Sequence, residues 1–278
     1  MMSSQRAAAS TLAVSSIRRR GRDHWTIFAA LGGVTTVAWI YLVIAARPMS
    51  TGTTDHSSAN AMQSMAHVRP WTAAEFGLML AMWTVMMVAM MAPTAAPMAF
   101  VYAAVARKAA SQDRPVAPTF VFVAGYLAMW GLFSVVATAA QWSLDQLALL
   151  SPMMVSASPV FGGVLLIGAG VYQLTPFKDA CLAHCRAPAY FISQHWRGGS
   201  VGAFRMGLEL GAYCLGCCWI LMGLLFVGGV MNLLWIAAIA MFILLEKTMP
   251  WAKTGGRVLG AAMILIGLLS LTGLVALG

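Results

Sequence analysis

The segment Arg205–Met222 reads RMGLELGAYCLGCCWILM, and its composition is that of a membrane-spanning helix. Three of the five cysteines of the chain, Cys214, Cys217 and Cys218, lie here within five residues. Thiols gain little as lipid-facing side chains, so their crowding into one apolar helix is the strongest chemical signal in the sequence. We therefore take this segment as the centre of the fold and work outward from it.

The composition places the chain among polytopic membrane proteins. Hydrophobic residues make up 60% of the 278 residues, charged residues make up 9%, and the mean hydropathy is +0.80. The predicted fold is all-α, a single bundle of about seven transmembrane helices, with six possible. The net charge of +9 is spread over loops between apolar segments, which predicts contact with the lipid bilayer and no nucleic-acid binding.

The chain divides into a short tail and one membrane domain. Residues 1–22 are acid-free and rich in Arg, which predicts a disordered cytoplasmic tail, and residues 23–278 form a single transmembrane domain. Pro93 and Pro97 are expected to end or kink the second span. The fourth and sixth spans are short and could be re-entrant. The expected spans are 25–46, 71–106, 118–140, 160–174, 202–230, 232–245 and 258–277.

The basic residues predict the orientation. With the N-terminus inside, all but two of the seventeen Lys and Arg residues fall on the cytoplasmic side, the exceptions being Arg47 and Arg69. The expected location is the bacterial inner (plasma) membrane, as a multi-pass protein with a cytoplasmic N-terminus.

A second cysteine cluster precedes the fifth span. If the segment after Pro176 is helical, then Cys181, His184 and Cys185 fall at positions i, i+3 and i+4 on one face. Two thiolates and an imidazole suit a soft or borderline ion, and the predicted ion is Cu(I), with Zn(II) less favoured. The short spacings and the odd cysteine count favour metal or redox chemistry over structural disulfides.

The cysteines of the fifth span repeat this geometry. Relative to Cys214, Cys217 lies about 60° to one side of the helix and Cys218 about 40° to the other, so all three can face the bundle interior. The alternative is that they are small polarisable packing residues. Neighbouring glycines would let another helix approach closely and complete a coordination shell, namely Gly202, Gly207, Gly211 and Gly216.

The acidic residues Glu209 and Glu246 lie in or beside apolar helices. Glu209 is a candidate ligand or proton acceptor beside the thiols, because a carboxylate at membrane depth is costly. The alternative is a structural ion pair with Arg205 near the headgroups. Glu246, beside Lys247, is expected to mark the membrane interface.

The second span carries six methionines within thirteen residues. Four of them follow the 3-4-4 spacing of one helix face and form what we call the methionine stripe: Met79, Met82, Met86 and Met90. Thioethers bind Cu(I) without deprotonation, so Met86 and Met90 are secondary ligand candidates. The alternative is that the stripe is apolar core.

With these residues in hand, the chain resembles a bacterial family of uncharacterised integral membrane proteins, DUF2182, described as predicted metal-binding. The resemblance covers roughly residues 72–250. It is carried by Trp83-Thr-Val-Met-Met-Val-Ala-Met-Met-Ala-Pro93, by a CxxHCR motif at Cys181–Arg186, by a CxGCCW motif at Cys214–Trp219, and by Glu246-Lys247. The resemblance implies a bound metal but names neither the metal nor an activity.

The resulting hypothesis is a membrane protein that binds copper(I) for handling or delivery rather than for catalysis. It would exchange the ion with a metal-donor or metal-acceptor protein, and the sequence gives no oligomeric state. One alternative is a thiol oxidoreductase coupled to quinone, since Cys214-Leu-Gly-Cys217 has the spacing of a cycling dithiol. The other is a structural or assembly subunit of a membrane complex, in which the cysteines only pack.

Overall fold

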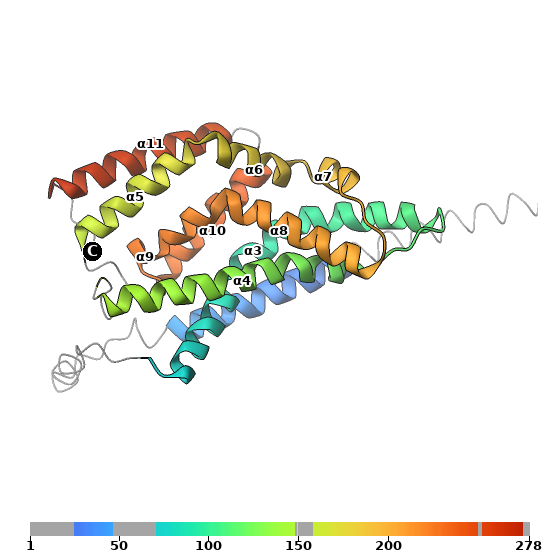
Figure 1. The fold of residues 1–278 in the computed structure, drawn as a ribbon, viewed down its shortest axis with the longest axis horizontal. Helices are drawn as coiled ribbons and strands as arrows, with labels where there is room; N and C mark the ends of the chain where they lie inside the picture. The colour runs from blue at the N-terminus through green and yellow to red at the C-terminus, as the bar shows by residue number, and fades with distance from the viewer. Residues whose placement is uncertain (1–24, 47–70, 148, 150–157, 250–251, 275–278) are drawn as a thin grey trace, which may run out of the picture.

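A computed structural model describes residues 25–46, 71–147, 149, 158–249 and 252–274. Helices make up nearly all of this part of the chain, and it contains no β-strand, which confirms the all-α class. The helices form one elongated bundle (Figure 1). The expected N-terminal tail lies outside the described residues.

Among the described residues, five helical stretches are long and apolar enough to cross a membrane, and their lengths agree with the multi-pass prediction. They are Trp25–Ala46, α3 (Ala73–Ala110), α4 (Thr119–Gln146), Gly199–Gly228, which comprises α8 (Gly199–Gly223) and α9 (Leu225–Gly228), and α11 (Ala252–Leu271).

A sixth crossing is counted only if one bent pair of helices is taken as a single span. Helices α5 (Pro159–Gln173) and α6 (Pro176–Arg186) pass the same test only together, and they are bent by 64° at the break. This is the short fourth span that the sequence marks as a possible re-entrant segment. The expected sixth span is α10 (Leu233–Thr248), whose 16 residues reach about 24 Å against a hydrocarbon core of about 30 Å.

Helix α3 continues through both of its prolines. It begins with a capping box between Thr72 and Glu75 and runs for 38 residues with Pro93 and Pro97 inside it. The prolines therefore do not end the helix, and Figure 1 shows that α3 changes direction along its length, as a missing backbone donor allows.

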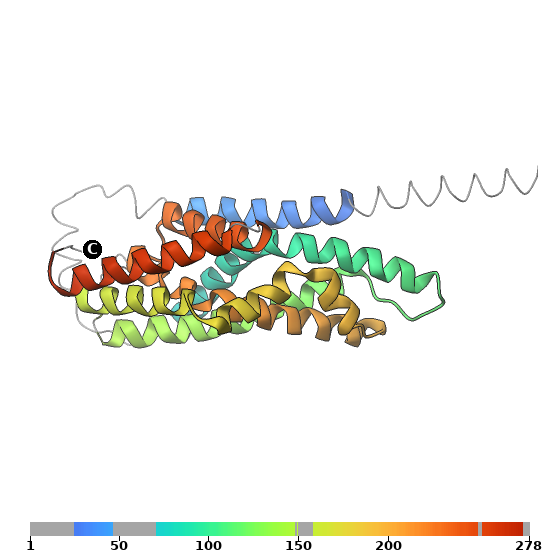
Figure 2. The same cartoon turned by 90° about the horizontal axis from the view of Figure 1, so that it is seen from above.

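Helix α8 is the central helix of the bundle. In the most apolar 18 residues of Gly199–Gly228, 56% of the residues are buried. The corresponding share is 17% for the helix Trp25–Ala46, which lies along the side of the bundle (Figure 2). Helices α4 and α8 touch backbone to backbone, because a Cβ on Gly207 would meet the carbonyl oxygen of Phe122, and one on Gly125 would meet that of Phe204. The expected role of small residues in helix approach is confirmed here.

Candidate metal centre

The first cysteine segment is helical, as the spacing predicts. Thr175 caps α6 by accepting from the backbone N–H of Lys178 at 3.3 Å, and Pro176 occupies the first turn, where its missing donor costs nothing. This short helix buries Cys181 and Cys185 on its inner face. Helix α7 (Pro188–Gln194) follows it and leads back to α8.

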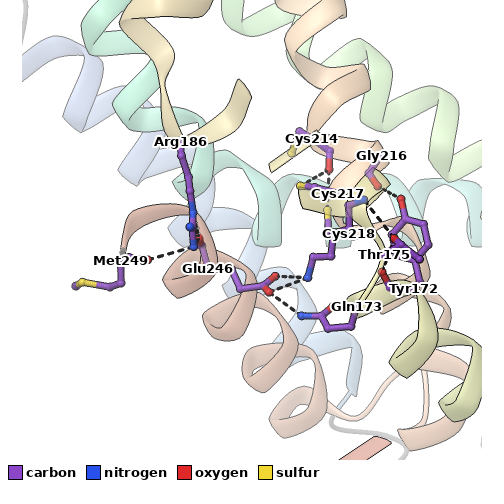
Figure 3. Close-up of polar contacts among 11 residues, drawn as sticks. Tyr172, Gln173, Thr175, Arg186, Cys214, Gly216, Cys217, Cys218, Glu246 and Met249 are labelled. Carbon is purple, nitrogen blue, oxygen red and sulfur yellow. Dashed lines mark hydrogen bonds and ion pairs between the residues drawn. The ribbon is translucent and has the colours of Figure 1, made fainter. Parts of the chain in front are cut away.

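The second cysteine segment lies in the middle of α8. Cys214, Cys217 and Cys218 are all buried, the exposed fraction of each being 2% or less. The thiols of Cys217 and Cys218 each donate to the backbone carbonyl of Cys214 at 3.0 Å (Figure 3). The three thiols therefore face the bundle interior rather than lipid.

The two segments meet. The thiol of Cys185 lies close enough to those of Cys214 and Cys217 to interact with both. Cys181 lies against Gly216, where an added Cβ would come within 2.9 Å of its sulfur. All five cysteines are free thiols, and we call the place where they meet the cysteine junction.

Polar groups from three other helices surround Cys214. The ammonium nitrogen of Lys247 in α10 lies 2.8 Å from its sulfur, and the hydroxyl of Tyr126 in α4 lies 2.9 Å from it. Thr94 in α3 links these two, at 3.0 Å from the Tyr126 hydroxyl and 3.4 Å from the Lys247 nitrogen. Tyr126 and Thr94 were not among the predicted site residues. The only signal for them is that each is a polar side chain inside an apolar span.

The thiols are close together but not arranged around a common centre. Within the described ranges, no group of three or more His, Cys, Asp or Glu side chains is arranged to hold a metal ion. The hydrogen bonds of Cys217 and Cys218 to the Cys214 carbonyl supply a physical reason, because they direct both thiols along α8. Binding an ion between the segments would exchange these weak bonds for metal–sulfur bonds.

His184 lies to one side of the thiols. Its ring stacks on Tyr213, with centroids 4.1 Å apart, and its Nδ1 lies 2.9 Å from the carbonyl oxygen of Ala180. The residue is half-buried. The structure thus places His184 next to the cysteine junction without bringing it into hydrogen-bond contact with any described cysteine.

Glu209 lies elsewhere on α8. Its carboxylate pairs with Arg197 at 2.8 Å and with Arg205 at 3.6 Å, and these side chains are partly exposed. The structure thus agrees with the alternative in which Glu209 forms a structural ion pair with Arg205, and it adds Arg197 as a second partner. No described contact joins Glu209 to a thiol.

Met86 and Met90 are fully buried in the core of α3. The methionine that contacts the network around Cys214 is a different one, Met91, whose sulfur lies 4.0 Å from the Thr94 hydroxyl.

Glu246 lies in the protein interior. Its side chain is only 5% exposed and forms an ion pair with Lys178, whose side chain is 3% exposed. The Lys178 nitrogen lies 2.7 Å from both carboxylate oxygens, and Gln173 donates to one of them at 2.6 Å (Figure 3). The sequence did not predict this buried ion pair, and the expected position of Glu246 at the membrane interface stays a prediction.

Together the long apolar helices and the buried cysteine junction indicate a multi-pass membrane protein with clustered thiols in its interior. A family model described as PpoB2, copper chaperone, matches residues 80–270. This match covers more than half of the chain, and the chain belongs to that family. No curated protein and no solved structure matches the chain. The family description names copper, in agreement with the predicted metal, whereas the DUF2182 assignment stays a prediction.

Proposed function

We propose that this protein binds Cu(I) as cargo at the cysteine junction and passes it on by exchange of thiolate ligands. The observation that carries the proposal is the packing of α6 on α8, where the Cys181 sulfur lies against Gly216 and the Cys185 thiol lies beside Cys214 and Cys217. Thiols from two separate chain segments thus come together inside the bundle. Thiolates are soft ligands that select Cu(I), and the family description names copper. Zn(II) is the less favoured ion.

The burial of the thiols suggests a direction of transfer. Cys181 is the least buried of the five at 9% exposed, whereas Cys214 is 1% exposed. An ion arriving at Cys181 would move to Cys185 and then to the thiols of α8, each step replacing one sulfur ligand by another. We place the N-terminus in the cytoplasm of a bacterial cell, so that the donor or acceptor protein meets the junction from that side.

The test is a measurement of bound metal. We expect the purified protein, loaded anaerobically with Cu(I) and washed with a weak chelator, to retain copper in a fixed ratio to protein. X-ray absorption should show sulfur as the main ligand. A variant with all five cysteines changed to Ser should retain none, whereas Glu209→Gln should retain the wild-type amount. Copper retention unchanged by removal of the cysteines, or no retention by the wild type, would contradict the proposal.

The same preparation distinguishes the alternatives. A thiol oxidoreductase would form a Cys214–Cys217 disulfide when incubated with a quinone, at a rate matching its turnover, and copper would not be required. A purely structural subunit would show the same yield and cell phenotype in wild type and in the variant without cysteines.

A further inference from the structure

The short helix α6 carries two of the five thiols. It has 11 residues and follows a break at which the chain turns by 64°. A helix of this length is marginal by itself, so its position must come from tertiary contacts. The contact between Cys185 and the thiols of α8 depends on that position.

Both ends of α6 are fastened to one residue of α10. Near its start, Lys178 pairs with the carboxylate of Glu246 at 2.7 Å and lies over the ring of Phe242, 5.9 Å from the centroid. At its end, Arg186 donates from Nε and Nη2 to the backbone carbonyl of Glu246, at 2.8 and 2.5 Å. Cys181 lies between these two attachments, and Cys185 directly precedes the second.

The next residue of α10 contacts the other cysteine helix. Lys247 reaches Cys214 of α8 at 2.8 Å and Thr94 of α3 at 3.4 Å. Two consecutive residues at the end of α10 therefore contact both cysteine segments, one through its carboxylate and backbone and the other through its ammonium group.

The Lys178–Glu246 pair is a costly way to fill this space. Removing two charges from water costs several kcal/mol per ion, and apolar side chains of similar volume often stabilise a fold equally well. Unlike apolar contacts, however, a bidentate ion pair supported by Gln173 at 2.6 Å fixes one relative position of the two helices. This pair therefore fixes the position of α6 along α10.

We propose that Glu246, together with the adjacent Lys247, is a positioning element that aligns α6 with α8, so that Cys185 faces Cys214 and Cys217. The alignment itself is independent of copper, whereas its effect on copper affinity rests on the proposed function. Glu246 is not a metal ligand in this scheme, and it acts through Lys178 and Arg186.

The test measures thiol proximity and copper binding separately. In a chain that keeps only Cys185 and Cys214, with the other three cysteines changed to Ser, dibromobimane should bridge the two thiols, since this reagent fluoresces on joining close thiols. In Glu246→Gln we expect the bridging rate to fall about tenfold or more, because Lys178 loses its counter-charge. With all cysteines present, the same change should weaken Cu(I) binding by about 10–100-fold, as is typical of outer-shell partners.

Three variants make the test specific. The charge swap Lys178→Glu with Glu246→Lys should restore bridging, which a loss of general packing would not do. Arg186→Met removes the second attachment without leaving a buried charge. If Glu246→Gln does not accumulate, the bridging rate of Arg186→Met tests the positioning role instead. Asp179→Asn is the matched control on the same helix, since Asp179 pairs with Lys253 and Arg257 of α11 near the surface and should leave bridging unchanged.

Wild-type bridging in folded Glu246→Gln or in folded Arg186→Met would overturn the positioning role, as would a folded charge swap that fails to recover it. A wild-type chain that binds no copper would overturn the proposed function alone, because the bridging result does not depend on copper.

Discussion

The cysteine junction and the methionine stripe of α3 both offer soft sulfur donors at helical spacing, and the structure treats them differently. The thiols come from α6 and α8 and contact polar groups of other helices, among them Lys247 at 2.8 Å and Tyr126 at 2.9 Å from the Cys214 sulfur. Met86 and Met90 come from one helix and lie fully buried in the apolar core of the bundle.

The difference shows what separates a candidate site from a packing pattern. A binding site gathers donors from several elements and supports them with further hydrogen bonds. The cysteine junction meets both conditions among the described residues, whereas Met86 and Met90 meet neither. Helical periodicity alone therefore does not distinguish a ligand set from a core.

The largest effect should follow the loss of the thiol that joins the two segments. Cys185→Ser removes the sulfur of α6 that contacts Cys214 and Cys217, and an oxygen is a poor ligand for Cu(I). We expect Cu(I) affinity to fall by at least about 100-fold, beyond the range typical of outer-shell changes. Competition against a chromogenic Cu(I) chelator measures it.

The control for this variant is Ser193→Ala in α7. It removes a hydroxyl that donates to the carbonyl of Tyr190 at 2.8 Å. It should bind copper as the wild type does. If Cys185→Ser also bound copper at wild-type strength, the meeting of the two segments would have no role in binding, and the contrast with the methionine stripe would lose its basis.

A smaller effect should follow the loss of the hydroxyl beside Cys214. Tyr126→Phe keeps the ring in place but removes the hydrogen bonds to the Cys214 sulfur and to Thr94. One neutral hydrogen bond contributes about 0.5–1.5 kcal/mol, so Cu(I) affinity should fall about 2–10-fold. The same competition assay measures it.

Tyr102→Phe is the matched variant. Tyr102 is also buried, and its hydroxyl donates to the carbonyl of Ala117 at 3.1 Å, away from the thiols. Tyr102→Phe should lower the free energy of unfolding by about as much as Tyr126→Phe does and leave copper affinity unchanged. Equal losses of affinity in both variants would mean that the effect of Tyr126 is one of folding rather than of the site.

Much of the fold follows from local pattern. Apolar runs predict the long helices, and the i, i+3, i+4 spacing at Cys181 and Cys214 correctly places the thiols on inner faces. Gly207 and Gly211 correctly predict the close approach of another helix, which proves to be α4. These features depend on neighbours within two or three turns of one helix.

The partners of the thiols could not be predicted in the same way. Glu209 and Glu246 look alike in sequence, each an acidic residue of an apolar helix with a basic residue nearby, yet one is paired near the surface and the other is buried against Lys178. Which environment each meets depends on how α10 and α6 are rotated and packed. That arrangement is set by contacts between residues 68 positions apart along the chain.

The smallest effect is expected from the methionine stripe, and it is the sharpest test of the contrast. Met86→Leu and Met90→Leu keep the volume and the apolar character of the side chain and remove only the thioether sulfur. Such swaps usually cost less than about 1.5 kcal/mol of unfolding free energy. If the stripe is core, copper affinity should stay within about twofold of wild type. This change is far smaller than the loss expected when one thiolate ligand is removed.

Met91→Leu separates packing from proximity within the same helix. Its sulfur lies 4.0 Å from the Thr94 hydroxyl, so it is the α3 thioether in contact with the network around Cys214. A loss of affinity in Met91→Leu alone would extend the cysteine junction onto α3 at one residue. A tenfold loss in Met86→Leu or Met90→Leu would instead restore the stripe as a ligand set and remove the distinction between the two regions.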